Sequence, residues 1–169
     1  MLALYACEVI ALFRIQIKAL TRAATIAGLY VVLCYALAPI SFGPVQLRVA
    51  EALTVLPILY VEAVPALFIG CLLANIIGGL GPWDIFGGSL VTLIAAAVTY
   101  RFRHSVIAYL SPIVLNGLLV SAYLSAIFKV PYVITALSIS ASEAIVVLLI
   151  GVPLIRYLRR RGTPYKQNP

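Results

Sequence analysis

The sequence predicts an all-α membrane protein built as a bundle of six transmembrane helices. Of the 169 residues, 64% are hydrophobic and only 10% are charged, whereas soluble chains are about half apolar and about a quarter charged. The apolar residues also fall in long runs. Because a helix needs about 20 apolar residues to cross a bilayer, the chain has room for roughly six spans and no separate soluble domain.

Charged residues and turn formers divide the chain into three parts. Residues 1–20 are expected to form a short leader or interfacial helix, because their apolar run is short and is followed by Arg14 and Lys18. Residues 21–158 form the membrane domain, and residues 159–169 form a basic cytoplasmic tail. The expected spans are residues 21–38, 46–60, 64–77, 85–100, 106–128 and 132–157.

The distribution of Lys and Arg predicts the topology. With both termini in the cytoplasm, every one of the 12 basic residues except Arg48 and Lys129 lies on the inner side, as the positive-inside rule requires. The opposite orientation would place the same residues outside. The net charge of +7 is therefore explained by topology, and we expect no nucleic-acid partner.

The stretch from Pro39 to Pro57 joins the first two spans and carries two isolated charges. Its Pro and Gly residues predict a loop, and we expect residues 40–45 to cover the outer mouth of the bundle. Arg48 and Glu51 follow, one helical turn apart. Charges at this depth are costly unless they are paired or face a polar cavity. The two residues therefore either mark a polar site or neutralise each other at the water interface.

Further polar residues fall within or near the outer ends of other spans. Charged residues within spans usually face the bundle interior or a cavity, so this pattern predicts a polar cup that opens to the outside. Glu62, at an inner turn, is expected to be solvated. The candidate substrate-binding residues are Arg48, Glu51, Asn75, Trp83, Asp84, Asn116 and Glu143.

These groups suit a flat, nitrogen-rich small molecule. A carboxylate, of Glu143 or Glu51, can accept two parallel hydrogen bonds from the adjacent N–H donors of a guanine-like edge. Asn75 or Asn116 could bind a neighbouring edge, and Trp83 could stack on the ring. Plainer interpretations place Trp83 in the interfacial aromatic belt and Asn116 in a hydrogen bond between helices.

No catalytic chemistry is indicated. The sequence has no Walker A motif for ATP hydrolysis, and neither an HExxH pattern nor a cysteine-rich metal pattern. Ser89 and His104 would be about 22 Å apart along a helix, too far for a catalytic pair. The three cysteines, Cys7, Cys34 and Cys71, each lie in an apolar run and are expected to be reduced packing residues. We therefore expect a protein that is not an enzyme and uses neither a cofactor nor a metal.

Two pairs of small residues lie on adjoining faces of the first span. Ala23 with Ala27, and Ala24 with Gly28, follow the small-xxx-small spacing that lets helices approach closely in lipid. The pattern alone fits either packing within the chain or contact with a partner subunit.

Several segments of the chain resemble the QueT family. The specific part is ISFGPVQLRVAEALTVLP at residues 40–57, followed by AVPALFIGCLLAN at residues 63–75. The similarity continues through GGLG at 78–81 and GGSL at 87–90, and returns at TALS at 135–138 and at Ser142-Glu143. QueT proteins are predicted substrate-binding (S) components of energy-coupling-factor (ECF) transporters, thought to import queuosine precursors.

The resemblance implies an S-component-like fold in the plasma membrane of a prokaryote. It implies capture of a 7-deazaguanine base from outside, and delivery with a transmembrane coupling subunit and two ATPase subunits. Under it, Ala23, Ala24, Ala27 and Gly28 would form the docking face. The alternatives are an S component for another small vitamin or heterocycle, or a self-sufficient small secondary transporter. Secondary transporters often contain internal repeats, and residues 21–75 and 85–128 show none.

Overall fold

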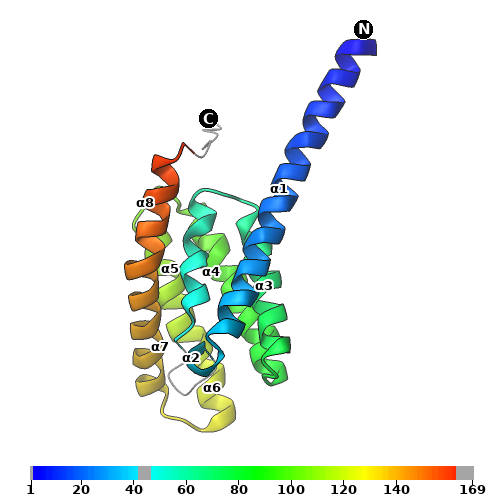
Figure 1. Cartoon of the computed structure of the whole chain (residues 1–169). Coiled ribbons are helices and arrows are strands. Elements are labelled where there is room, and N and C mark those ends of the chain that lie inside the picture. The colour runs from blue at the N-terminus through cyan, green and yellow to red at the C-terminus, as the bar shows by residue number, and fades with distance from the viewer. Residues whose placement is uncertain (1, 42–46, 163–169) are drawn as a thin grey trace.

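The computed structural model describes the backbone of residues 2–41 and 47–162, and side chains from Gln16 onward within these ranges. All regular elements in this part of the chain are helices, so the predicted all-α class is confirmed. Figure 1 shows an elongated bundle of antiparallel segments, with the start of α1 and the end of α8 at the same end. The small helix α2 and helix α6 lie at the opposite end.

The helices follow one another with short connections. Three elements (η2, η3 and η4) are π-helical turns that run directly into an α-helix, and η1 is a 3₁₀ helix. In chain order the elements are α1 Leu2–Ala36, α2 Ala38–Ser41, η1 Val49–Ile58, α3 Ala63–Ile77, η2 Trp83–Gly88, α4 Ser89–Arg101, α5 Ile107–Leu115, η3 Asn116–Val120, α6 Ser121–Phe128, α7 Tyr132–Val146, η4 Val147–Gly151 and α8 Val152–Arg160.

Four helical segments of the described chain are long and apolar enough to cross a membrane. They are Gln16–Ala36, Trp83–Arg101, Ile107–Phe128 and Tyr132–Arg160. Two further apolar helices, Val49–Ile58 and Ala63–Ile77, are shorter. The chain is therefore a multi-pass membrane protein. The count of six spans and the cytoplasmic location of both termini stay predictions.

The 3₁₀ helix η1 lies at the centre of the bundle. It packs against α1, α3, α4, α5, α7, η4 and α8, and its residues from Ala50 to Ile58 are all buried. A 3₁₀ helix rises about 2.0 Å per residue, against about 1.5 Å for an α-helix. Ten residues therefore extend about 20 Å, so a short segment passes through most of the core.

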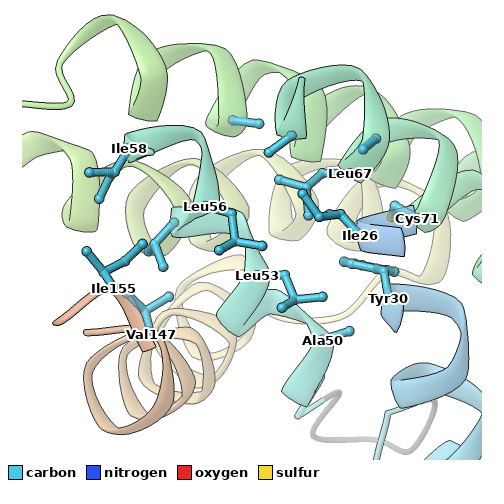
Figure 2. Packing of buried hydrophobic residues seen from close by; sticks show 14 of the residues in the cluster. Ile26, Tyr30, Ala50, Leu53, Leu56, Ile58, Leu67, Cys71, Val147 and Ile155 are labelled. Carbon is cyan, nitrogen blue, oxygen red and sulfur yellow. The ribbon is translucent and has the colours of Figure 1, made fainter. Parts of the chain in front are cut away.

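Apolar side chains from η1, α1, α3 and the last helical segment form the core. Figure 2 shows Leu53 and Leu56 of η1 among them, with Tyr30 on one side and Ile155 on the other. Glycine allows a close approach of η4 to η1, because a Cβ at Gly151 would lie 3.1 Å from Val55 Cγ2. This distance is tighter than an ordinary contact, so a side chain at position 151 would have to displace Val55 slightly.

Large apolar side chains also cover the outside of the bundle. Leu149 is 71% exposed, and Leu20, Ile134 and Leu137 are similarly open. A water-soluble monomer rarely exposes apolar surface on this scale. In a bilayer the same side chains face lipid tails, which agrees with the composition.

Two structural details concern α1 and the turn that precedes α3. The predicted leader and the first span form one continuous helix, α1, which begins at Leu2. Glu62 was expected to be solvated, and this expectation is wrong. Its Oε1 lies 2.5 Å from Nε of Arg22, whose guanidinium also lies 5.0 Å from the centroid of the Tyr60 ring.

Candidate substrate-binding site

One polar pocket lies in the half of the bundle that is remote from the termini. Its empty space is about 340 Å³ including the open mouth, but the cavity that admits a water molecule is only about 20 Å³. Residues from η1, η2, α4, η3, α6 and α7 meet there. The lining is formed by Arg48, Glu51, Gly88, Thr92, Asn116, Val120, Tyr123, Ile139 and Glu143.

Glu51 enters this pocket from the central helix η1. Its side chain is almost fully buried, and the Tyr30 hydroxyl donates a hydrogen bond to Oε1. The Thr54 hydroxyl donates to the backbone carbonyl of Glu51 at 2.6 Å, which holds this turn of η1. No described residue forms a hydrogen bond with Oε2 of Glu51. One carboxylate oxygen is therefore anchored and the other is available.

Glu143 enters the pocket from α7 with a similar arrangement. Nδ2 of Asn116 donates a 2.9 Å hydrogen bond to Oε1 of Glu143. Oε2 of Glu143 has no hydrogen-bond partner within the described ranges. Leaving such a buried acceptor unsatisfied costs about 1–3 kcal/mol. Both carboxyl groups in the pocket can thus accept hydrogen bonds from an incoming molecule.

Close packing of two helices brings Asn116 to Glu143. Gly117 directly follows Asn116, and a Cβ at Gly117 would lie 1.9 Å from Ser140 Oγ on α7. A side chain at position 117 would force the Ser140 hydroxyl to turn away and would still lie 3.1 Å from Ser140 Cβ, so glycine favours this close packing. Asn116 also begins the π-helical turn η3, and π-turns in helices are frequent at functional sites.

A hydrogen-bonded cluster of Tyr123, Asp84 and Asn75 lies next to the pocket. Tyr123, which lines the pocket, donates a 2.9 Å hydrogen bond to Oδ1 of Asp84. Asn75 donates to the backbone carbonyl of Asp84 at 2.7 Å. A Cβ at Gly88 would lie 3.4 Å from both Asn75 Nδ2 and the Tyr123 hydroxyl. Asn75 and Asp84 therefore position Tyr123 and do not line the pocket themselves.

Arg48 supplies the positive charge of the pocket. It precedes the first turn of η1, and its Nη1 lies 4.0 Å from the sulfur of Cys71. The Thr92 hydroxyl approaches the same sulfur at 3.5 Å and also donates to the carbonyl of Gly88. Cys71 thus contacts several polar side chains next to the pocket, in addition to its place in the apolar core.

The structure brings together four of the seven predicted binding residues. Arg48, Glu51, Asn116 and Glu143 line one pocket. Trp83 does not belong to this group, because its side chain is 63% exposed and lies outside the lining. The stacking role assigned to Trp83 from the sequence therefore has no support in this arrangement. Most of the expected covering loop of residues 40–45 lies outside the described residues, which leave out 42–46.

Sequence reasoning missed the tyrosines Tyr30 and Tyr123. Each is a hydroxyl-bearing residue within an apolar run, which is a weak signal, because tyrosine is also common at membrane interfaces. Their partners, Glu51 and Asp84, lie 21 and 39 residues away in the sequence. Nothing in local spacing connects them.

The two small-residue pairs of α1 have different surroundings. Ala23 and Ala27 are half-buried and pack against the core of the same chain. A Cβ at Gly70 of α3 would lie 3.1 Å from the carbonyl oxygen of Ala27. This pair therefore serves packing within the chain. Ala24 and Gly28 are exposed, so only this second pair is open to a partner.

The sequence was compared with protein families, curated proteins and solved structures. The model of the family described as "QueT transporter" matches residues 20–160. This range contains every residue that lines the pocket and both small-residue pairs. Curated proteins and solved structures give no match.

Proposed function

Because the chain belongs to the QueT transporter family, we propose that it is the substrate-binding S component of an ECF-type importer. Membership of a transporter family, together with the apolar helices, establishes a multi-pass membrane transporter and not an enzyme. The proposal adds the substrate, a queuosine precursor with a 7-deazaguanine base, and the ATP-driven partners. It also places the chain in the plasma membrane of a prokaryote.

The substrate proposal rests on two carboxyl groups that each have a hydrogen-bond partner at only one oxygen. Oε2 of Glu51 and Oε2 of Glu143 lie in one pocket, and within the described part of the chain neither has a hydrogen-bond partner. A guanine-like base presents two adjacent N–H donors beside a carbonyl acceptor. A carboxylate accepts from the two donors, and arginine is a common donor to the carbonyl of guanine. Arg48 or Asn116 would take that role.

The small cavity implies that the ligand moves side chains as it enters. About 20 Å³ admits little more than one water molecule, which is far less than a bicyclic base. Two buried carboxyl oxygens without partners are unfavourable in the empty state. A molecule that donates hydrogen bonds to both would relieve this cost, so separation of Glu51 from Glu143 on binding is expected.

The placement of the pocket supports uptake from outside. Tyr123 of α6 lines the pocket, and α6 lies at the end of the bundle opposite the start of α1 and the end of α8 (Figure 1). If the termini are cytoplasmic, as the basic residues predict, the pocket opens outward. A transmembrane coupling subunit would then contact the exposed pair Ala24 and Gly28 on α1, and two ATPase subunits would supply the energy.

The test is a titration of the purified full-length chain in detergent with 7-deazaguanine, guanine and adenine. We expect binding of the first two and much weaker binding of adenine, which lacks the donor pair next to a carbonyl. Equal binding of all three bases, or of none, would argue against the proposed substrate. If the chain alone, in liposomes, moved the base under an ion gradient, it would be a secondary transporter and the ECF proposal would be wrong.

A further inference from the structure

A second hollow of the molecule lies between α1, η1 and α8, apart from the polar pocket. Its volume is about 590 Å³, within the range of about 300–1,000 Å³ that small-molecule sites occupy. Apolar side chains make up most of its wall. They include Ile26, Leu29, Leu53, Leu56, Leu154 and Leu158. We refer to it as the α1–α8 groove.

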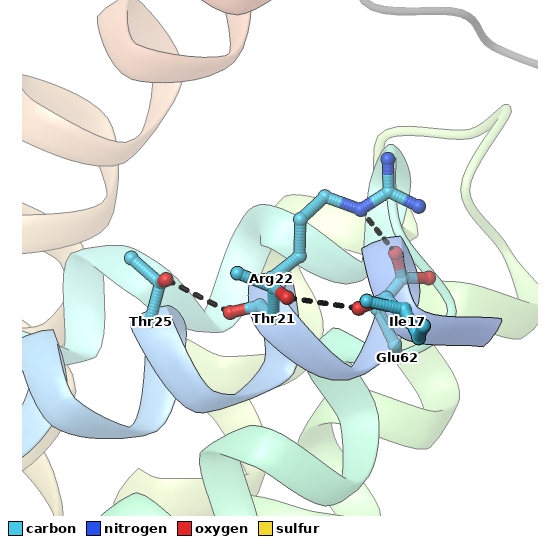
Figure 3. Close-up of polar contacts among 5 residues, drawn as sticks. All are labelled: Ile17, Thr21, Arg22, Thr25 and Glu62. Atoms are coloured by element: carbon cyan, nitrogen blue, oxygen red, sulfur yellow. Dashed lines mark hydrogen bonds and ion pairs between the residues drawn. The ribbon is translucent and has the colours of Figure 1, made fainter. Parts of the chain in front are cut away.

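The wall of the groove offers an occupant few polar partners. Thr21 and Thr25 line it, but their hydroxyls donate to backbone carbonyls of their own helix, at 2.9 Å to Ile17 and 2.8 Å to Thr21 (Figure 3). A hydroxyl engaged in this way leaves the wall effectively apolar. A hydrocarbon chain fits such a surface.

One end of the groove is basic. Lys18 and Arg22 line it near the end of the bundle that carries the termini. Arg161 does not line the groove, but it ends α8 three residues after the lining residue Leu158, and its guanidinium lies 5.1 Å from the centroid of the Tyr157 ring. Glu62 is the acidic residue described at this end, and it is already paired with Arg22. Lys18 and Arg161 therefore leave a positive charge beside an apolar channel.

We propose that the α1–α8 groove binds an anionic phospholipid. One acyl chain lies along the leucines, and the phosphate lies against Lys18 and Arg161. Basic pockets between transmembrane helices are known to bind anionic head groups. A neutral lipid would fill the apolar part but would gain nothing from the basic end. The exposed small pair Ala24 and Gly28 does not line the groove.

The test uses the purified full-length chain in a neutral detergent. Phosphatidylglycerol or phosphatidylcholine with identical acyl chains is added, and an apparent Kd is obtained from the shift of the thermal unfolding midpoint with lipid concentration. We expect phosphatidylglycerol to bind at least about tenfold more tightly, which corresponds to about 1.4 kcal/mol. The double variant Lys18→Gln/Arg161→Gln should lose this preference and still bind phosphatidylcholine as the parent does.

Three further variants separate charge at the groove from general charge. Arg101→Gln removes a basic residue that ends α4 and does not line the groove, so the preference should persist. Glu62→Gln removes the acidic partner of Arg22 and should strengthen phosphatidylglycerol binding. Thr25→Trp fills the groove and should weaken the binding of both lipids. If Thr25→Trp does not fold, the charge variants still decide the question.

Several results would overturn the proposal. One is equal binding of the two lipids by the parent chain. Another is loss of the preference in Arg101→Gln to the same extent as in the double variant, since the effect would then arise from the overall charge. A third is efficient cross-linking of a cysteine at Thr25 to a coupling subunit in the assembled transporter, because the groove would then be a protein interface.

Discussion

Asn116 and Glu143 join two helical segments across the polar pocket. Nδ2 of Asn116 donates to Oε1 of Glu143 at 2.9 Å, and this bond fixes the plane of the carboxyl group. The second oxygen, Oε2, is buried beside the pocket and has no hydrogen-bond partner among the described residues. Glu51 is held on the other side of the pocket by Tyr30 in the same one-sided manner. The site thus contains two carboxyl groups, Glu51 and Glu143, each held by a hydrogen bond to one of its oxygens.

Removal of the Tyr30 hydroxyl should destabilise the protein. In Tyr30→Phe, Oε1 of Glu51 loses its hydrogen-bond donor while remaining buried, which costs about 1–3 kcal/mol. The free energy of unfolding in mixed micelles measures this effect. Tyr35→Phe is the matched control, because Tyr35 lies on the same helix and is 69% exposed. Equal stability of the two variants would show that the Tyr30–Glu51 contact does not contribute.

A methyl group at position 117 should lower the stability of the protein, because the Ser140 side chain must move to accommodate it. Gly117→Ala would place Cβ 1.9 Å from Ser140 Oγ, and such overpacking costs about 1–3 kcal/mol. Adding Ser140→Ala removes the closest atom and should restore part of the lost stability. Gly28→Ala is the control, since nothing lies within 4 Å of its Cβ. A Gly117→Ala variant as stable as Gly28→Ala would contradict the close packing of η3 on α7.

The two small-residue pairs of α1 should respond differently to a large side chain. Ala27→Trp should impair folding, because Ala27 packs against the core of its own chain and cannot accept the added volume. Ala24→Trp should fold and bind ligand as the parent does, but should no longer co-purify with the coupling subunit. Co-purification from membranes and ligand titration together measure both effects. Retention of the complex by Ala24→Trp would remove this face as the docking surface.

Replacement of Trp83 should leave ligand affinity nearly unchanged. The indole is 63% exposed and does not line the pocket, so a stacking contribution of about 1–3 kcal/mol per base is not expected. Titration of Trp83→Phe and Trp83→Ala with the base should give affinities within about twofold of the parent. If the indole stacked on the base with about 1.4 kcal/mol, its loss would lower the affinity roughly tenfold. A larger loss in Trp83→Ala alone would mean that the indole moves onto the ligand.

The all-helical class and part of the site could be predicted from the sequence for a simple physical reason. Charged and amide groups in apolar runs are costly in a membrane, so Glu51, Asn116 and Glu143 were identifiable as inward-facing residues. All three line the pocket. Arg48 was identifiable in the same way, although its spacing from Glu51 also fits a pair at the water interface.

Other features depend on whether a side chain points into the bundle or outward, and the sequence alone does not determine this. Ala23 and Ala24 belong to equivalent small-residue patterns, but only the first packs inside. Trp83 adjoins Asp84, yet the indole is exposed while the carboxyl group is buried. The 3₁₀ form of η1 has no local signature either. It depends on burial among the surrounding helices, since 3₁₀ runs longer than about four residues are uncommon.

The most direct test of the proposed site is calorimetric titration of Glu143→Gln with 7-deazaguanine. The variant keeps the size of the side chain and can still accept from Asn116, but it has an NH₂ group in place of the unpartnered Oε2. A donor would then oppose a ligand donor. We expect affinity to fall by at least about tenfold, or about 1.4 kcal/mol, and to fall most for bases with an exocyclic amine. Glu62→Gln, the same change outside the pocket, should bind normally. If Glu143→Gln binds every base as the parent does, Glu143 is structural, and Glu51 becomes the better candidate for recognition.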